Sequence, residues 1–320
     1  MSPSRKRNPI RETKQTALTH GKAGANLGSA RATLPSPGGR GSDVLLTSPT
    51  GRRAGDEGEQ TIKSYPTPYA EANAAVEALL DGVEETLGEQ MVGLYLYGSL
   101  ASGDFDPQTS DIDFLIVTRE ALSESQVSAL EAMHARLWAA GPKMAAKLEG
   151  KYLPLADLPR FEAQAGPFPT VNEGEFFLAK QESDWIIQRW VLREQGVAVM
   201  GPPLEPLIEP VSPEMLRGAV LGYLREWWMP MLARPTRLES SEYQAYAILS
   251  MCRALYTLRN GEIASKPVSA RWAQTEFGSW AGLIESALSW RTGSELGVAR
   301  DTANWIGFTL RQAGIEEGYG

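Results

Sequence analysis

The stretch that decides the fold is Gly93-Leu94-Tyr95-Leu96-Tyr97-Gly98-Ser99, followed by Ser110-Asp111-Ile112-Asp113 and the apolar run 114–117. The apolar runs before Gly98 and after Asp113 predict two strands joined by a short polar loop. Side chains alternate faces along a strand, so Asp111 and Asp113 are expected to point to one side while Ile112 points into the core. Aspartate is disfavoured inside a strand, which indicates a functional site at this pair.

Two carboxylates this close repel each other, and a proton, a basic neighbour or a divalent cation relieves the repulsion. Hard oxygen ligands with no Cys or His nearby fit Mg²⁺, which keeps most of its water and accepts substrate phosphates as further ligands. Gly98 leaves room for a triphosphate beside the backbone. Ser99, at the expected start of a helix, and Ser110 offer donors to it. The stretch therefore predicts a metal-dependent nucleotidyl transfer site. An Asx-rich turn over 104–110 is the plainer alternative, but it explains only the loop.

A third carboxylate, Glu149, lies in the strand-like run 147–153. If this strand lies beside the one that carries Asp113, Glu149 faces the same site and can act as a general base on an attacking hydroxyl. Spacing alone does not decide between this role and the alternative, in which Glu149 is an exposed strand residue paired with Lys147 or Lys151. Asp157 is a weaker candidate for the same role.

A length of 320 residues is enough for two domains. A content of 42% hydrophobic and 22% charged residues indicates an ordinary globular protein. The single Cys252 rules out an internal disulfide and suits a reducing cytoplasm. No apolar run approaches the roughly 18 residues that span a membrane, so we expect no membrane partner. The two histidines, His20 and His134, are too few for a histidine-based metal site, and His134 is expected to be solvated or to cap a helix.

Residues 1–64 are rich in Ser, Gly, Pro, Thr and Arg, lack apolar periodicity and are predicted to be a disordered, dispensable tail. Residues 1–60 carry 10 Lys and Arg against 5 Asp and Glu, a net +5, which leaves −13 on the rest of a chain whose total is −8. The tail has no apolar run of the kind found in secretory signals, so we do not expect it to be one. An organellar transit peptide, an over-long gene start and a weak nucleic-acid-binding tail are alternatives.

The ordered part is predicted to have an α+β fold with two domains, 65–200 and 201–320. The first reads as a small mixed sheet with helices, among them one near 121–140 that starts at Ser123. The proline-rich segment 201–213 reads as a linker. The second domain reads as an all-α bundle that closes a ligand cleft, with helices near 213–229, 241–259, 267–275, 280–291 and 294–313. Its aromatic residues are expected to pack the core: Trp227, Trp228, Tyr243, Tyr246, Trp272 and Trp280.

These motifs resemble the nucleotidyltransferase superfamily and, within it, the aminoglycoside adenylyltransferases that modify streptomycin and spectinomycin. Segments 96–99 and 110–113 carry the superfamily motif. The sequences of 250–257, 261–266 and 270–273 are similar to the helical domain of the aminoglycoside adenylyltransferases. The resemblance spans 68–315 and implies a nucleotidyltransferase-type mixed sheet followed by a helical bundle.

The resemblance also implies roles for individual residues. Asp111, Asp113 and Glu149 would be the catalytic acids and Mg²⁺ ligands, with Glu149 as the base. Trp290 matches, more weakly, an aromatic residue near the nucleotide. Lys266 has independent support, because a cation at a helix start opposes the dipole and needs an anionic partner, and so does Arg253 among apolar neighbours. Residues implied to bind the ATP co-substrate are Gly98, Ser99, Ser110, Asp184, Arg253 and Lys266.

The implied reaction is Mg²⁺-dependent transfer of AMP from ATP to a hydroxyl of an aminoglycoside-like small molecule, with release of diphosphate and resistance to the antibiotic. The −13 charge favours a polycationic acceptor and disfavours nucleic acid. We expect a cytoplasmic monomer. The family's streptomycin-selecting acid aligns with Tyr243, beside Glu242, so the acceptor stays open. A protein side chain or an RNA end as acceptor, or a non-catalytic nucleotide-binding homologue, are the alternatives.

Overall fold

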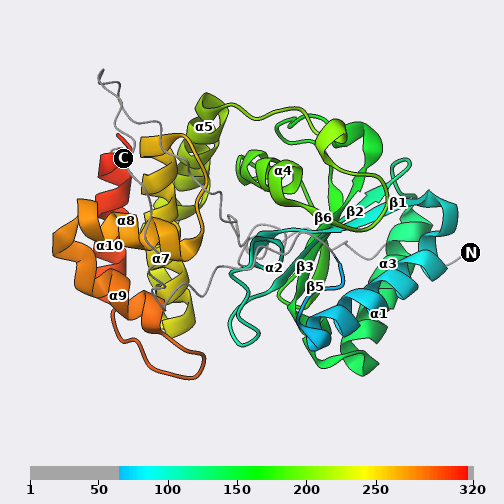
Figure 1. Cartoon of the computed structure of the whole chain (residues 1–320), viewed down its shortest axis with the longest axis horizontal. Coiled ribbons are helices and arrows are strands. Elements are labelled where there is room, and N and C mark those ends of the chain that lie inside the picture. Colours follow the sequence, from blue (N-terminus) through cyan, green and yellow to red (C-terminus); the bar gives the residue numbers. More distant parts are fainter. Residues whose placement is uncertain (1–64, 316–320) are drawn as a thin grey trace, which may run out of the picture.

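The computed structural model describes residues 65–315, so the predicted tail 1–64 lies outside the described residues. Two halves lie side by side: a sheet with its covering helices, and a bundle of helices built by the last third of the chain (Figure 1). The sheet has the strand order β5-β4-β3-β2-β1-β6. The predicted α+β fold, with a mixed sheet followed by a helical region, is confirmed.

The strands are short, and β2 and β3 run parallel while the other neighbours run antiparallel. They are β1 (Met91–Leu96), β2 (Ile112–Thr118), β3 (Leu148–Pro154), β4 (Phe168–Asn172), β5 (Glu175–Ala179) and β6 (Val197–Met200).

The helices of the first half are α1 (Ala70–Leu87), α2 (Gly98–Ser102), α3 (Glu124–Ala140) and α4 (Asp184–Gln195). Those of the second half are α5 (Pro213–Tyr223), α6 (Met229–Ala233), α7 (Ser241–Asn260), α8 (Lys266–Glu276), α9 (Ala281–Ser289) and α10 (Ala299–Gln312). Short 3₁₀ turns lie at Gly88–Gln90, Lys143–Lys147, Leu155–Asp157, Glu205–Leu207, Pro235–Glu239 and Gly278–Trp280.

Helix starts follow the expected capping chemistry. The Ser123 side chain accepts the backbone N–H of Gln126, and the Gln126 side chain accepts the N–H of Ser123, which forms a capping box at α3. Ser265 caps α8 in the same way, with its hydroxyl accepting the N–H of Val268. Lys266 is therefore the first residue of α8, as predicted from the sequence.

Alternation along the strands sends neighbouring residues to two different hydrophobic clusters. Leu94 and Phe114 pack in the cluster with α1 and α3. Tyr95 and Leu115, one residue later on each strand, pack in a second cluster that continues through α4 into the helices of the second half. The division at residue 200 stays a prediction, since this second cluster joins residues on both sides of it.

His134 corrects one sequence-based expectation. Its side chain is fully buried and its Nε2 hydrogen-bonds the Tyr152 hydroxyl at 2.8 Å, between the rings of Phe114, Trp138 and Phe176. It is neither solvated nor a cap. Burial lowers its pKa from 6.5 to about 4, so the imidazole is neutral at ordinary pH. Among residues 65–315, no helix is both long and apolar enough to cross a bilayer.

Candidate active site

Asp113 on β2 and Glu149 on β3 are register partners across the parallel pair. Neighbouring strands lie about 4.8 Å apart, so side chains at matched positions stand next to each other. Leu115 on β2 and Leu153 on β3, which share the face of Asp113 and Glu149, pack in the cluster that reaches the helical half. The two carboxylates therefore face that half. Both residues are buried, at 3% and 8% exposure.

The pair opens into a pocket of about 410 Å³, which we call the β3 pocket. Tyr97, at the end of β1, donates a hydrogen bond to Gln188 at 3.2 Å, and Gln188 donates one to Asp184 at 2.9 Å. Burial raises the pKa of Tyr97 well above its ordinary value, and the charges of Asp113, Glu149 and Asp184 raise it further. Tyr97 thus remains a neutral phenol among three carboxylates.

A second pocket, of about 280 Å³, lies beside α2 and the loop that follows it, and we call it the α8 pocket. Ser99, Ser110 and Asp111 line it from the sheet half, and Lys266 and Trp290 line it from the helical half. Gly98 begins α2 with a φ of 66°, a conformation that favours glycine, so this strand-to-helix turn explains the glycine at this position.

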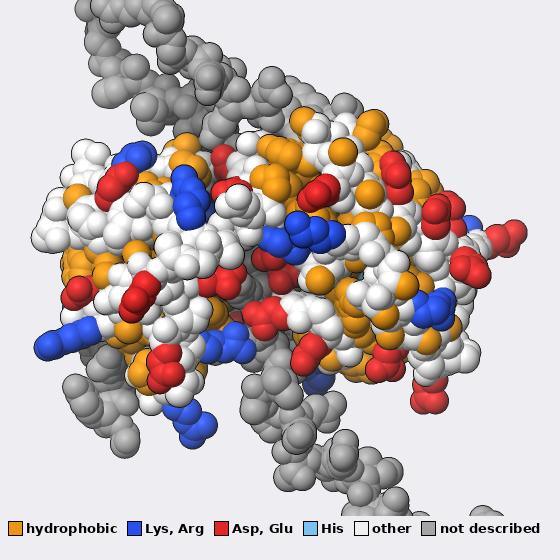
Figure 2. Space-filling model, turned by 90° about the horizontal axis from the view of Figure 1, so that it is seen from below, with side chains coloured by type: hydrophobic (Ala, Val, Ile, Leu, Met, Phe, Trp, Pro, Cys, Tyr) orange, Lys and Arg blue, Asp and Glu red, His pale blue; other side chains and the backbone are white. Residues whose placement is uncertain are grey.

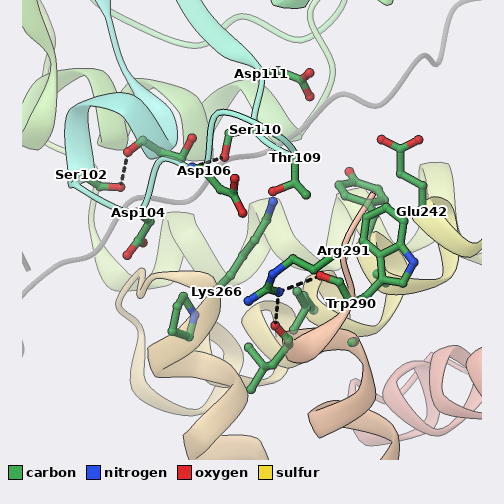
Figure 3. Close-up of a pocket in the computed structure, with 17 residues that line it drawn as sticks. Ser102, Asp104, Asp106, Thr109, Ser110, Asp111, Glu242, Lys266, Trp290 and Arg291 are labelled. Atoms are coloured by element: carbon green, nitrogen blue, oxygen red, sulfur yellow. Dashed lines mark hydrogen bonds between the residues drawn. The ribbon is translucent and has the colours of Figure 1, made fainter. Parts of the chain in front are cut away.

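Hydrogen bonds fix the loop that forms this pocket. The Ser110 hydroxyl accepts the backbone N–H of Asp106 at 3.0 Å, and Lys147 donates to the carbonyl oxygens of Gln108 and Ser110 at 3.1 and 3.0 Å. Thr292, after α9, donates to the same Gln108 oxygen at 3.2 Å, which ties the loop to the helical half. Figure 3 shows the Lys266 side chain extending from the start of α8 toward this loop.

Arg253 on α7 lines neither pocket, although one acidic residue of each, Asp104 and Asp113, influences its pKa. It is 2% exposed, and its Nε and Nη2 have no hydrogen-bond partner within the described part of the chain. Burial lowers its pKa to about 10, and the neighbouring Tyr246, Tyr223, Asp104 and Asp113 oppose that shift. A buried guanidinium with unpaired N–H groups is costly unless an anion completes it. Arg253 is thus suited to an anion bound between the pockets.

A pair of tyrosines lies near Arg253. The hydroxyls of Tyr223 on α5 and Tyr246 on α7 are 3.0 Å apart. Tyr223 lines the β3 pocket and Tyr246 lines the α8 pocket, so the pair marks where the two pockets adjoin. A π-helical turn at Leu224–Trp228 follows Tyr223 directly, and such turns are frequent at functional sites.

The structure sorts the sequence-predicted residues into two sets. Asp113, Glu149 and Asp184 line the β3 pocket, and Ser99, Ser110, Asp111, Lys266 and Trp290 line the α8 pocket. No group of three or more His, Cys, Asp or Glu residues within 65–315 is arranged to hold a metal ion. The three acids Asp111, Asp113 and Glu149 are thus not gathered into one cluster. Asp157 lies apart from both pockets, in the turn after β3.

Several residues of the site escaped the sequence analysis. Tyr246 and Trp227 were expected in the core, yet they line the α8 pocket and the β3 pocket. A signal for Tyr246 existed, since it lies seven residues before Arg253 and therefore on the same face of α7. Lys151 also lines the β3 pocket, two residues after Glu149, which is the strand spacing for one face.

Both pockets are rich in acidic residues, and Figure 2 shows acidic side chains gathered around the hollow between the two halves. The acidic lining residues are Asp104, Asp106, Asp111 and Glu242 in the α8 pocket and Asp113, Glu149, Glu182 and Asp184 in the β3 pocket. Each pocket also has two cations, Lys266 and Arg291 in the first and Lys151 and Lys180 in the second. The arrangement can accept a cationic molecule next to a bound polyanion.

Two family models match separate parts of the chain. Residues 76–159 match the nucleotidyltransferase domain, and residues 206–306 match the C-terminal domain of aminoglycoside adenylyltransferase. The first range contains Asp111, Asp113 and Glu149, and the second contains Arg253 and Lys266.

Relatives and a solved structure agree with these matches. The chain is 24% identical over 220 residues to spectinomycin 9-adenylyltransferase of Campylobacter jejuni, covering 66% of this chain and 79% of the relative. It is 26% identical over 214 residues to aminoglycoside (3'') (9) adenylyltransferase of Shigella flexneri, covering 64% and 79%. The crystal structure of spectinomycin adenyltransferase AAD(9) from Enterococcus faecialis with ATP and spectinomycin superposes with a TM-score of 0.61 at 17% identity, covering 75% of this chain and 98% of that one. At this identity the superposition shows the fold alone.

Proposed function

Because the chain belongs to the nucleotidyltransferase superfamily, in the branch of the aminoglycoside adenylyltransferases, we propose that it transfers AMP from ATP to a hydroxyl of an aminoglycoside-like acceptor. One observation carries the proposal. The buried register pair Asp113 and Glu149 faces the helical half, where Arg253 is also buried and its Nε and Nη2 have no hydrogen-bond partner among the described residues. A phosphoanhydride needs carboxylates for its metal and a cation for its oxygens, and this pairing supplies both.

The α8 pocket is the proposed place of the ATP phosphates. Its hydroxyls on Ser99 and Ser110 can donate to phosphate oxygens, and the Lys266 ammonium supplies a point charge. Arg253 would complete its hydrogen bonds with phosphate oxygens between the two pockets. Trp290 offers an aromatic face in the same pocket, which fits a base or a ribose.

The donor set fits a hydrated divalent cation. Asp113 and Glu149 present hard oxygen donors side by side, while Asp111 lines the adjoining pocket. Mg²⁺ keeps several of its waters and takes phosphate oxygens as ligands, so one or two carboxylates can be enough for it. Asp113 and Glu149, with Asp111 as a further candidate ligand, would hold the Mg²⁺, and the bound ion would neutralise phosphate charge.

The β3 pocket is the proposed place of the acceptor. The acceptor oxygen attacks the α-phosphorus and forms the new P–O bond, the bond from the α-phosphorus to the bridging oxygen breaks, and diphosphate leaves. Glu149 takes the hydroxyl proton as the bond forms. The acidic lining of both pockets favours an acceptor that carries ammonium or guanidinium groups.

Two assays test the proposal. Purified protein is incubated with labelled ATP, Mg²⁺ and either spectinomycin or streptomycin, and small-molecule products are separated from macromolecular ones. We expect an adenylylated drug and free diphosphate. In a sensitive host, expression of the wild type, but not of Glu149→Gln, should protect against the drug. Label found only on protein or RNA, or none on any acceptor, would refute the proposed acceptor class.

A further inference from the structure

Lys151 stands on the same face of β3 as Glu149. The intervening Gly150 points to the opposite face, where an added Cβ would meet the Phe114 carbonyl oxygen and ring. Two residues of a strand span about 6.6 Å, so the Glu149 carboxylate and the Lys151 ammonium can reach two oxygens of one small molecule. Lys151 also lines the β3 pocket, and the α8 pocket has no contribution from it.

The surroundings of the Lys151 ammonium leave its donors to a ligand. Its Nζ lies 4.8 Å from the centroid of the Trp185 ring, which is 1% exposed, and Lys151 itself is half-buried. Among the described residues the Lys151 ammonium makes no hydrogen bond, although an ammonium has three N–H donors. The ring face stabilises the charge without accepting these N–H groups in an ordinary hydrogen bond.

Acidic residues line the β3 pocket together with Lys151, namely Glu149, Glu182 and Asp184. The Trp185 ring covers one side of the Lys151 ammonium and shields that side from water. Such a group gains most from an uncharged or anionic oxygen and repels a second cation in the same place.

On the basis of the proposed function, we propose that Lys151 is a specificity-determining residue that donates a hydrogen bond to an oxygen of the acceptor next to the hydroxyl facing Glu149. The acceptor accordingly carries a carbonyl, ether or hydroxyl oxygen at that place, and its ammonium or guanidinium groups lie elsewhere. Spectinomycin, which is rich in carbonyl and ether oxygens, suits this arrangement better than streptomycin, which carries two guanidinium groups.

The experiment measures acceptor binding by calorimetry and steady-state constants for ATP and for each drug. Lys151→Met keeps an unbranched apolar chain over Trp185 and removes the donors, and Lys151→Arg keeps the charge. Lys143→Met removes an exposed lysine outside both pockets and serves as the matched control. Thermal melting confirms that each variant folds.

We expect Lys151→Met to weaken spectinomycin binding and raise its KM about ten- to a hundredfold, the loss for a hydrogen bond to a charged group. The KM for ATP should stay unchanged, streptomycin should lose less, and Lys151→Arg should recover part of the loss. Equal changes in the ATP and drug constants, or none, would overturn the role of Lys151 while leaving adenylyl transfer intact. A wild type that binds neither drug would overturn this inference and the proposed acceptor together.

Discussion

Asp113 and Glu149 are in register on the parallel strands β2 and β3, and both carboxylates face the helical half of the molecule. The parallel pairing of β2 and β3 places these two residues, which are 36 positions apart in the chain, next to each other on one face of the sheet. Because both are buried, a proton or a cation must accompany them. The catalytic proposal rests on this pair.

Glu149→Gln should lower kcat about 10²–10⁴-fold, the usual contribution of a positioned base, because an amide cannot take the proton of the attacking hydroxyl. Binding of ATP in the absence of Mg²⁺ should change little, because the proposed phosphate contacts lie in the α8 pocket. Initial rates of diphosphate release measure the effect. Glu175→Gln, at an exposed glutamate on β5, is the control and should keep the wild-type rate. A Glu149→Gln enzyme with full activity would exclude Glu149 as the base.

Asp113→Asn should raise the Mg²⁺ concentration needed for half-maximal rate at least tenfold, since a neutral amide binds a hard cation less well than a carboxylate. Binding of Mn²⁺, followed by electron paramagnetic resonance without substrate turnover, should weaken in parallel. Asp81→Asn, at an exposed position of α1, should change neither quantity. Unaltered Mn²⁺ binding in Asp113→Asn would place the metal elsewhere.

Lys266→Met should raise the KM for ATP about ten- to a hundredfold, because a charged hydrogen bond to phosphate is lost from the α8 pocket. The KM for the acceptor should be nearly constant. Lys143→Met removes an exposed lysine outside both pockets and should leave both constants unchanged. If Lys266→Met changed the acceptor constant alone, the assignment of the two pockets would have to be exchanged.

Gly150→Ala should push β3 away from β2, because the new methyl group meets the backbone carbonyl of Phe114, which cannot move cheaply. We expect a loss of about 1–3 kcal/mol in the free energy of unfolding and a large loss of activity. Gly218→Ala is the control: the added carbon on α5 meets nothing within 4 Å. It should stabilise the helix by about 0.5–1 kcal/mol. Chemical denaturation measures both; a neutral Gly150→Ala would show that this strand pair tolerates separation.

His134 predicts a pH dependence of stability. Its pKa is lowered from 6.5 to about 4 in the folded protein, so between these pH values the unfolded chain binds a proton that the folded chain does not. Stability from this group is full above pH 6.5 and falls by up to about 3 kcal/mol as the pH drops to 4. Melting temperatures from pH 7.5 to 4.5 should fall less steeply for His134→Gln than for the wild type. Parallel curves would contradict the assignment.

Local signals in the sequence were enough for the mixed sheet, the capping of α3 and the helical second half. The lysine at the start of α8 is a local feature, and this expectation holds in the structure. Asp111 lies one residue before β2 and lines a different pocket from Asp113, so a shared face for these two carboxylates stays a prediction. The resemblance to aminoglycoside adenylyltransferases is also confirmed. The roles of the individual site residues stay predictions.

The features that could not be predicted from the sequence depend on contacts between residues far apart in the chain. The hairpin of β4 and β5, helix α4 and the edge strand β6 were not predicted, because short strands outside a strong apolar pattern gain their stability from neighbours in the sheet. His134 looked like a helix-surface residue because its partner Tyr152 is on a distant strand. Likewise, an aromatic residue such as Tyr246 has the same pattern in a core and in a pocket wall.

Adenylyl transfer is tested most directly by the mass of the drug recovered after wild type and Glu149→Gln are incubated with ATP, Mg²⁺ and spectinomycin. The wild type should yield drug carrying one adenylyl group, with one diphosphate released per product, and the variant should bind ATP yet yield almost no modified drug. Unmodified drug from an ATP-binding wild type, or equal product from both proteins, would contradict it.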